Sequence, residues 1–147
     1  MMGRWSIAVA LFVIIAAAGA ALIVLPGPAK APTTNERAQK PDRISVDTPR
    51  IGDAIASPVN VSGKARGNWY FEASFPVEVL DSRGAVIAQA PAQAQGEWMT
   101  TEYVPFYLKI SFPQQTSDSS GSIVLKKDNP SGLPEHDEDL VIPIVFR

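Results

Sequence analysis

The 147-residue chain contains no cysteine and a single histidine. Without cysteine it cannot form a disulfide, a thiolate nucleophile, a Cys-ligated metal site or a lipid-modified N-terminal cysteine. A Ser–His–Asp triad could use only His136, and no nucleophile-elbow sequence is present. Glu72, Glu78 and Glu97 could supply an acid/base pair for glycoside hydrolysis, but their spacing does not set the separation that this chemistry requires. We therefore expect a protein that is not an enzyme and needs no cofactor.

Positive charge is scarce in most of the chain. Residues 44–147 carry 8 lysines and arginines against 13 aspartates and glutamates, a formal net charge of −5. A protein that binds DNA or RNA relies on lysine and arginine to neutralise phosphates, and an acidic body repels them. We therefore expect no nucleic-acid partner.

A long apolar run opens the chain. Residues 6–25 contain no charged side chain, and twenty apolar residues in a helix are about enough to cross the hydrocarbon core of a bilayer. The alternative is a cleaved signal peptide, because Ala29-Lys30-Ala31 has the form of a cleavage site. The run is longer than the apolar region of about 7 to 15 residues in such peptides, and Pro32 would follow the cut. The sequence therefore favours a transmembrane anchor over residues 1–25.

Residues 26–43 read as a tether. They contain four prolines and almost no large apolar side chain, so the segment cannot bury enough surface to offset its ordering entropy. If extended, its roughly 18 residues would span on the order of 50 Å. Orientation is less clear, since more basic residues follow the apolar run than precede it, and this count alone would keep the tail in the cytoplasm.

The remaining residues, 44–147, show the alternation of β-strands. Apolar side chains occupy every second position over residues 106–112 and 140–146, which places them on one face of a sheet. Weaker alternations start at Ile44, Val59, Val77, Val86 and Ile123. Turn residues separate these runs, and the segment 81–84 predicts a tight hairpin with Gly84 at positive φ. We expect an all-β domain, an antiparallel sandwich of about seven strands, with Pro143 on an edge strand or at a bulge.

Three segments carry a family resemblance: residues 67–78, 96–100 and 128–135, supported by residues 51–63. Together they resemble the immunoglobulin-like domain of bacterial spore germination and sporulation proteins, the GerMN-associated domain, and the likeness covers nearly all of residues 44–147. It implies an immunoglobulin-like fold, an extracytoplasmic setting and an accessory interaction role, with no catalytic residues. On this basis we expect a single-pass protein of the cell membrane whose C-terminal domain lies outside the cytoplasm.

Three consecutive aromatic residues, Trp69, Tyr70 and Phe71, are the first candidate contact site. Neighbours on a strand point to opposite sides, so at least one of the three should be exposed. Trp69 or Tyr70 could stack on a glycan or anchor a protein partner; alternatively, both cover the open end of the sandwich. Trp98 is expected to pack in the core.

An acidic loop is the second candidate. Six side chains offer oxygen ligands around a Pro/Gly turn: Asp128, Asn129, Glu135, Asp137, Glu138 and Asp139. A hard cation such as calcium needs ligands of this kind, but the spacing is not that of an EF-hand. The alternative is a rigid acidic turn, and we predict no metal site. Asn129, Glu135 and Asp137 are expected to contact a partner.

These observations predict a membrane-anchored, non-enzymatic binding module in the cell envelope, with a role in sporulation or germination. Its expected partner is an envelope protein. The alternative is a cell-wall glycan, peptidoglycan, held by the aromatic cluster near Asn68 and Glu72.

Overall fold

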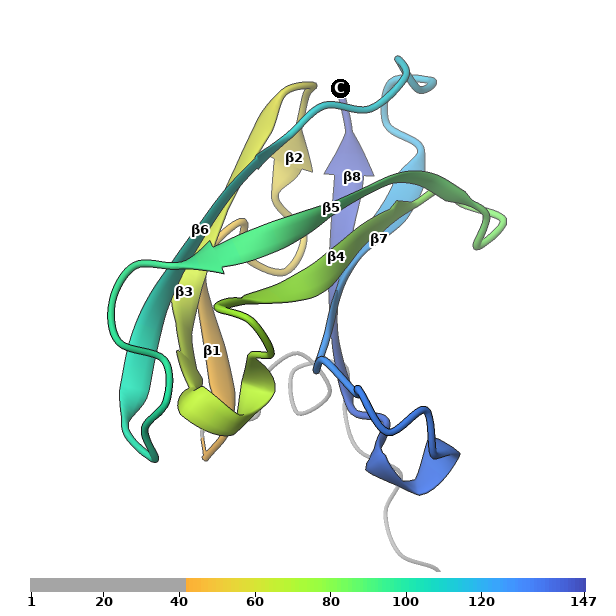
Figure 1. The fold of residues 1–147 in the computed structure, drawn as a ribbon. Helices are drawn as coiled ribbons and strands as arrows, with labels where there is room; N and C mark the ends of the chain where they lie inside the picture. Colours follow the sequence, from red (N-terminus) through yellow and green to blue (C-terminus); the bar gives the residue numbers. More distant parts are fainter. Residues whose placement is uncertain (1–41) are drawn as a thin grey trace, which may run out of the picture. The chain divides into compact units, whose positions relative to one another are not determined.

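The computed structural model describes residues 42–147, which form strands and two single-turn 3-10 helices (Figure 1). The elements are β1 (Ile44–Thr48), β2 (Ala54–Ile55), β3 (Val59–Arg66), η1 (Gly67–Trp69), β4 (Ser74–Leu80), β5 (Val86–Ala94), β6 (Tyr103–Ile110), β7 (Ser120–Lys126), η2 (Pro134–His136) and β8 (Asp139–Phe146). The all-β prediction is confirmed. In this part of the chain no helix has the length and apolar character needed to cross a membrane. The predicted anchor, and the predicted tether up to residue 41, lie outside the described residues.

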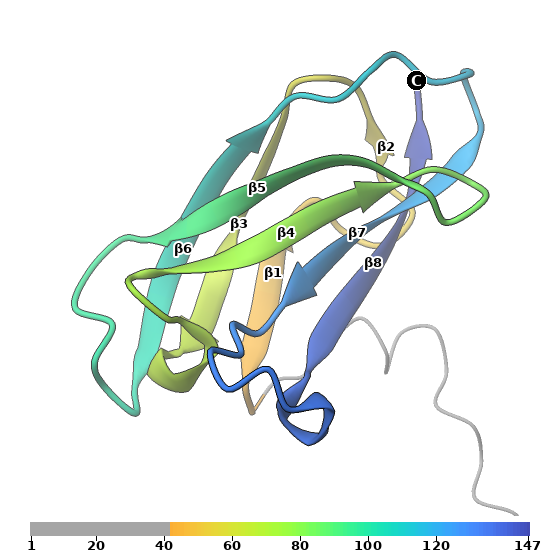
Figure 2. The same cartoon turned by 45° about the vertical axis from the view of Figure 1, so that its right-hand side comes forward.

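The strands form one hydrogen-bonded sheet in the order β1-β3-β6-β5-β4-β7-β8-β2. β5 and β6 pair through Gln93–Tyr107 and Ala94–Phe106, and just past β5 the Gln95 N–H donates to the Pro105 carbonyl at 2.8 Å. At the other end of this short ladder, Pro91 of β5 has no N–H to extend it. At this narrow junction the sheet folds over, so that β1, β3 and β6 face β4, β7 and β8 (Figures 1 and 2). The two layers of the predicted sandwich are therefore present, but they belong to one continuous sheet.

The seven strands expected from the alternation are all present, and the described residues add one more, β2. This strand was missed because two residues, Ala54 and Ile55, are too short to show a period. β2 pairs with the end of β8 in parallel, so the prediction of a purely antiparallel arrangement is wrong at this edge. Pro143 was predicted on an edge strand or at a bulge, but β8 is not an edge strand, because β2 flanks its outer side. β2 pairs only with Val145 and Phe146, so Pro143 lies beyond that pairing and its missing N–H interrupts no hydrogen bond to β2.

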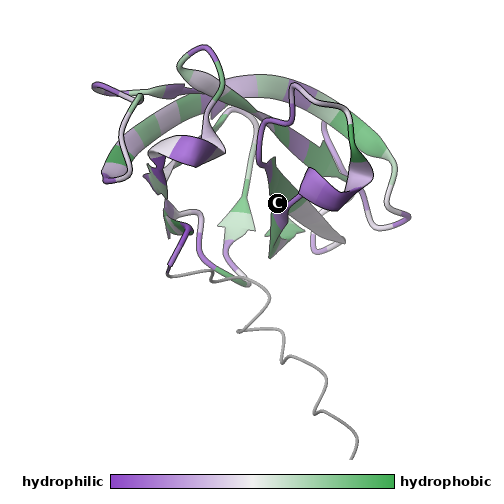
Figure 3. Cartoon of the chain, turned by 60° about the horizontal axis from the view of Figure 1, so that its bottom comes forward, coloured by the Kyte–Doolittle hydropathy of each residue, from purple (hydrophilic) through white to green (hydrophobic). Residues whose placement is uncertain are grey.

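The core follows from the alternation, which is visible as hydrophilic and hydrophobic bands along the strands (Figure 3). The residues of β8 at 140, 142, 144 and 146 are all at most 2% exposed. Phe75 on β4 and Phe106 on β6 meet edge to face across the two layers, with ring centroids 5.1 Å apart. Fully burying each such apolar side chain stabilises the fold by about 1.5–3 kcal/mol. The core thus fixes both layers and the loops that join them at each end.

Candidate functional site

The two segments singled out in the sequence meet at one end of the domain. η1 and η2 both lie at the end opposite the C-terminus (Figures 1 and 2). The main-chain N–H of Asp128 donates a hydrogen bond of 3.0 Å to the carbonyl of Trp69. We call residues 67–74 together with residues 127–137 the loop end. The aromatic run and the acidic loop, about sixty residues apart in the chain, are therefore one surface.

A cavity of about 250 Å³ opens at the loop end, and we call it the end cavity. Two of the predicted contact residues, Tyr70 and Asn129, line it. The other lining residues are Asn68, Phe71, Lys127, Asp128, Pro130, Ser131 and His136. Glu135 and Asp137 are exposed next to the cavity but are not among its lining residues. The end cavity is therefore lined by positively and negatively charged side chains, by amide and hydroxyl groups and by aromatic residues.

Trp69 and Tyr70 point into the protein. Trp69 is fully buried and Tyr70 is 4% exposed. The Tyr70 hydroxyl donates a 2.7 Å hydrogen bond to the carbonyl of Val104, and burial raises the pKa of this phenol. The assumption that the aromatic run lies on a strand is wrong, because residues 67–69 form the turn of η1. Neither ring offers an exposed face on which a glycan could stack. Trp69 and Tyr70 instead close the end of the sandwich, which was the alternative interpretation of the sequence.

Phe71 is the exposed member of the aromatic run, at 42% of its surface. It opens a two-residue turn in which Phe71 and Ser74 exchange main-chain hydrogen bonds of 3.0 and 3.1 Å. The central residues, Glu72 and Ala73, have φ values of +50° and +63°. A turn with both central residues at positive φ strongly favours Asn-Gly, and the left-handed conformation costs other residues roughly 1–2 kcal/mol each. A strained turn therefore presents Phe71 beside the end cavity.

The acidic loop is held by its own side chains. The Asn129 amide donates to the Leu133 carbonyl at 2.9 Å and to the Asp137 carboxylate at 2.7 Å. The Ser131 hydroxyl donates to the Asn129 side-chain oxygen and lies 3.0 Å from Nδ1 of His136. Within residues 42–147 no three acidic or histidine side chains converge as metal ligands. The loop is thus a pre-organised rim, and Asn129 and Asp137 act first on each other.

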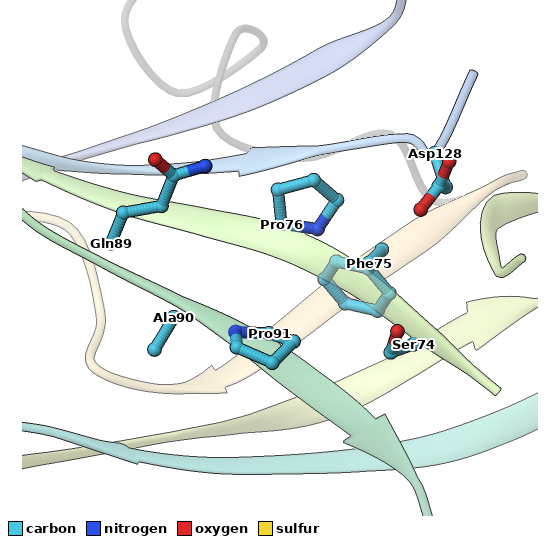
Figure 4. A pocket seen from close by; sticks show the side chains of 7 residues that line it. All are labelled: Ser74, Phe75, Pro76, Gln89, Ala90, Pro91 and Asp128. Atoms are coloured by element: carbon cyan, nitrogen blue, oxygen red, sulfur yellow. The ribbon is translucent and has the colours of Figure 1, made fainter. Parts of the chain in front are cut away.

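A second cavity, of about 380 Å³, lies against β4 and β5, and we call it the side cavity. Pro76 and Pro91, which are directly opposite each other on the two strands, border it (Figure 4). Asp128 lines both the side cavity and the end cavity. The two hollows are therefore neighbours, and the turn of the loop end that precedes β4 contributes Phe71 to the end cavity and Ser74 to the side cavity. Sequence reasoning missed the side cavity, because cross-strand pairing of two prolines has no local signal.

Trp98 is half-buried and packs against the core, as predicted. The segment that follows it lies tightly on η1. A Cβ atom added at Gly67 would come within 1.9 Å of the Thr100 carbonyl oxygen and 2.3 Å of the Trp98 carbonyl oxygen. Glycine at residue 67 is therefore required for η1 to pack here. The close packing of residues 98–100 against η1 therefore supports the loop end.

Comparison with known protein families supports an immunoglobulin-like fold. Residues 43–133, more than half of the chain, match Gmad2, the immunoglobulin-like domain of bacterial spore germination. The match ends before η2 and β8, which complete the second layer in the structure. No curated protein matches the chain. The chain belongs to the family of immunoglobulin-like domains of bacterial spore germination.

Proposed function

We propose that this protein is a membrane-anchored, non-enzymatic module of the bacterial cell envelope that acts in germination. Residues 1–25 anchor it, residues 26–43 hold the domain away from the membrane, and the domain lies outside the cytoplasm. The loop end and the side cavity bind an envelope protein. The germination role rests on the family, and the anchor rests on the apolar run of residues 6–25.

The observation that carries the protein-binding role is the exposed Phe71 on its strained turn, between two hollows that share Asp128. Strained backbone tends to be kept where it serves function, and phenylalanine is among the aromatic residues that are enriched in protein interfaces. The side cavity adds proline rings, and the end cavity adds charged and amide groups that give direction to the contact. Both hollows are near or below the lower limit of about 300–1,000 Å³ typical of small-molecule pockets, so a protein surface fits better than an enclosed metabolite.

The proposal is tested with a photo-crosslinking amino acid placed at residue 71 of the full chain in native membranes. We expect one envelope protein, identified by mass spectrometry, to be captured at residue 71. The matched control is the same amino acid at Arg83, which is exposed in the β4–β5 hairpin. Equal capture from both positions, or no capture at residue 71 in cells that are germinating, contradicts the proposal.

The location is tested separately. Protease added to spheroplasts should cut the domain and leave a membrane-embedded N-terminal fragment of roughly 25 to 40 residues, as expected for a single apolar helix followed by a tether. A domain that is cut only after the cells are lysed would place it in the cytoplasm, and release of an intact soluble domain without its apolar run would indicate a cleaved signal peptide.

A further inference from the structure

The outward face of β3 and β6 is cationic, although the domain as a whole is acidic. In the register of these strands Lys64 lies opposite Pro105, Arg66 opposite Tyr103 and Asn60 opposite Lys109. These side chains share one face, because the residues between them are the buried core positions. Neither strand contains an aspartate or glutamate. We call this surface the β3–β6 face.

Tyr103 holds two of the cations in place. The Arg66 guanidinium lies 4.0 Å from the centre of its ring and the Lys64 ammonium lies 5.2 Å from it. Arg66 also donates to the carbonyl of Thr101 at 3.1 Å. A guanidinium stacked and hydrogen-bonded in this way loses less freedom when it binds an anion. The cations are therefore pre-organised on a surface that solvent reaches.

Tyr107 supplies an exposed ring at the centre of the same face. It is 44% exposed, and its hydroxyl donates to the side-chain oxygen of Asn60 at 3.0 Å. Lys109 follows two residues along β6, about 7 Å away along the strand. Gln93, at the end of β5, lies opposite Tyr107. The ring is thus held by a cross-strand partner, with a cation on the same strand and amides on both sides.

The acidic side chains near this face lie at its rim. Glu102 precedes β6 and lies 3.8 Å from Arg66 with its side chain 80% exposed, a surface pair of little energetic weight. Asp47 lies at the β-bulge of the edge strand β1. By contrast, Lys126 on the outer surface of the opposite layer is paired with Glu78 at 3.4 Å. The charge of Lys64 and Lys109 is therefore available to a ligand, whereas that of Lys126 is partly neutralised.

We propose that the β3–β6 face binds an anionic wall polysaccharide, with Tyr107 stacking on a sugar ring and Lys64, Arg66 and Lys109 pairing with its carboxylates or phosphates. The face is built for a polar polymer, since it combines an exposed ring, amides and cations. It has no outward valine, leucine or isoleucine to insert into a bilayer, as interfacial membrane binding requires. The inference depends on the proposed extracytoplasmic location and on no part of the loop end.

The test is co-sedimentation of the full chain, in detergent, with purified peptidoglycan sacculi. Lys64→Gln with Lys109→Gln should weaken binding by at least about tenfold, and so should Tyr107→Ala, as expected when a central contact is removed. Tyr107→Phe should bind nearly as well as the wild type, because the ring remains. Binding should also fall between 0.05 and 0.5 M salt, since salt screens charges separated by more than about 10 Å at 0.1 M. Sacculi stripped of their phosphodiester polymers with hydrofluoric acid identify the anion: retained binding assigns it to peptidoglycan carboxylates, and lost binding to polymer phosphates.

Lys126→Gln is the matched control, because it removes the same charge from the opposite layer and should change binding by less than about twofold. Equal effects of Lys126→Gln and the Lys64/Lys109 pair would overturn the inference, as would binding to anionic lipid vesicles without binding to sacculi. Phe71→Ala, with the photo-crosslinking amino acid moved to Leu133, an exposed residue of the loop end, separates the two proposals. If this variant loses its crosslinked protein and keeps the sacculi, both surfaces act independently; if it loses the sacculi, the β3–β6 face is not the site.

Discussion

Two tight turns of this domain place residues at positive φ, and they differ in which residue types take that conformation. The hairpin between β4 and β5 has Gly84 at φ +80°, and the Asp81 carboxylate accepts hydrogen bonds from the main-chain N–H groups of Arg83 and Ala85 at 2.8 and 2.9 Å. The turn from Phe71 to Ser74 places Glu72 and Ala73 at positive φ without a glycine. The first turn has the residues that its backbone requires, and the second does not.

The difference separates a turn whose residues match its backbone from the turn that carries the proposed protein contact. At the hairpin, local sequence preference and tertiary structure agree, which is the usual condition of a foldable sequence. At the loop end they conflict, and the strain is held by Trp69, Tyr70 and the main-chain contact to Asp128. Such conflicts are expected mainly at sites retained for function. The following changes test whether the loop end depends on its core support as this comparison requires.

The largest effect is expected from Trp69→Ala. Trp69 is fully buried and meets Phe75 edge to face at 6.3 Å. Removing such a ring costs about 3–5 kcal/mol, a large share of the 5–15 kcal/mol typical of domains of this size. Phe71→Ala, two residues away and exposed, should change the free energy of unfolding by less than about 0.5 kcal/mol. Urea denaturation of both variants measures the difference; similar losses for the two would mean that Phe71 also belongs to the core.

Features that depend on neighbouring residues were predicted from the sequence, and features that depend on packing between distant segments were not. Alternation along strands predicted the core because the period of two is a local property, and the hairpin was predicted because Gly84 is a local signal. The role of Trp69 and Tyr70 in closing the end of the sandwich was one of the two interpretations of the sequence, but η1 was not predicted, since it forms where Gly67 packs against residues 98–100. The side cavity and the β3–β6 face depend on cross-strand register, such as Pro76 opposite Pro91 or Lys64 opposite Pro105. Register over these distances is fixed by the whole sheet and has no signature in one segment.

The next effect is expected at the hairpin. Gly84→Val places a β-branched residue at φ +80° and should destabilise the domain by about 1–2 kcal/mol. Apart from its two chain neighbours, no heavy atom lies within 4 Å of the position that a Cβ at residue 84 would take, so the loss would come from the backbone and not from a clash. Gly96→Val is a suitable control, because that glycine is also in open space and is not among the residues with positive φ. Equal losses in thermal denaturation would show that the conformation of Gly84 is not what matters.

The reverse change is predicted for the strained turn. Replacing Glu72 with Asn and Ala73 with Gly gives the residues that this turn favours, and should stabilise the domain by about 1 kcal/mol after the greater freedom of unfolded glycine is subtracted. The melting temperature should rise and crosslinking from residue 71 should be retained, because Asn-Gly favours the same backbone conformation and keeps Phe71 in place. Lost capture despite the rise in stability would contradict this and would mean that the side chain of Glu72 or Ala73 takes part in the contact.

The smallest effect is expected on the way the melting temperature falls at low pH, and it depends on Asp81. The Arg83 guanidinium, bound to the Asp81 carboxylate at 2.8 and 3.1 Å, together with the Ala85 N–H, lowers the pKa of Asp81. Because this pKa is lower in the folded state than in the unfolded state, Asp81 contributes stability above the unfolded value of about 3.9. That contribution is lost as the pH falls through the folded value. The melting temperature of Asp81→Asn should therefore lie below that of the wild type at pH 7, and the gap should close at low pH.

Arg83→Gln provides the control for this last prediction, since it removes the cation and leaves the carboxylate with its two main-chain donors. Its pH profile should lie between those of the wild type and Asp81→Asn, because part of the lowered pKa comes from the N–H groups of the turn. A melting-temperature gap between the wild type and Asp81→Asn that stays the same at every pH would show that the charge of the Asp81 carboxylate does not stabilise the hairpin.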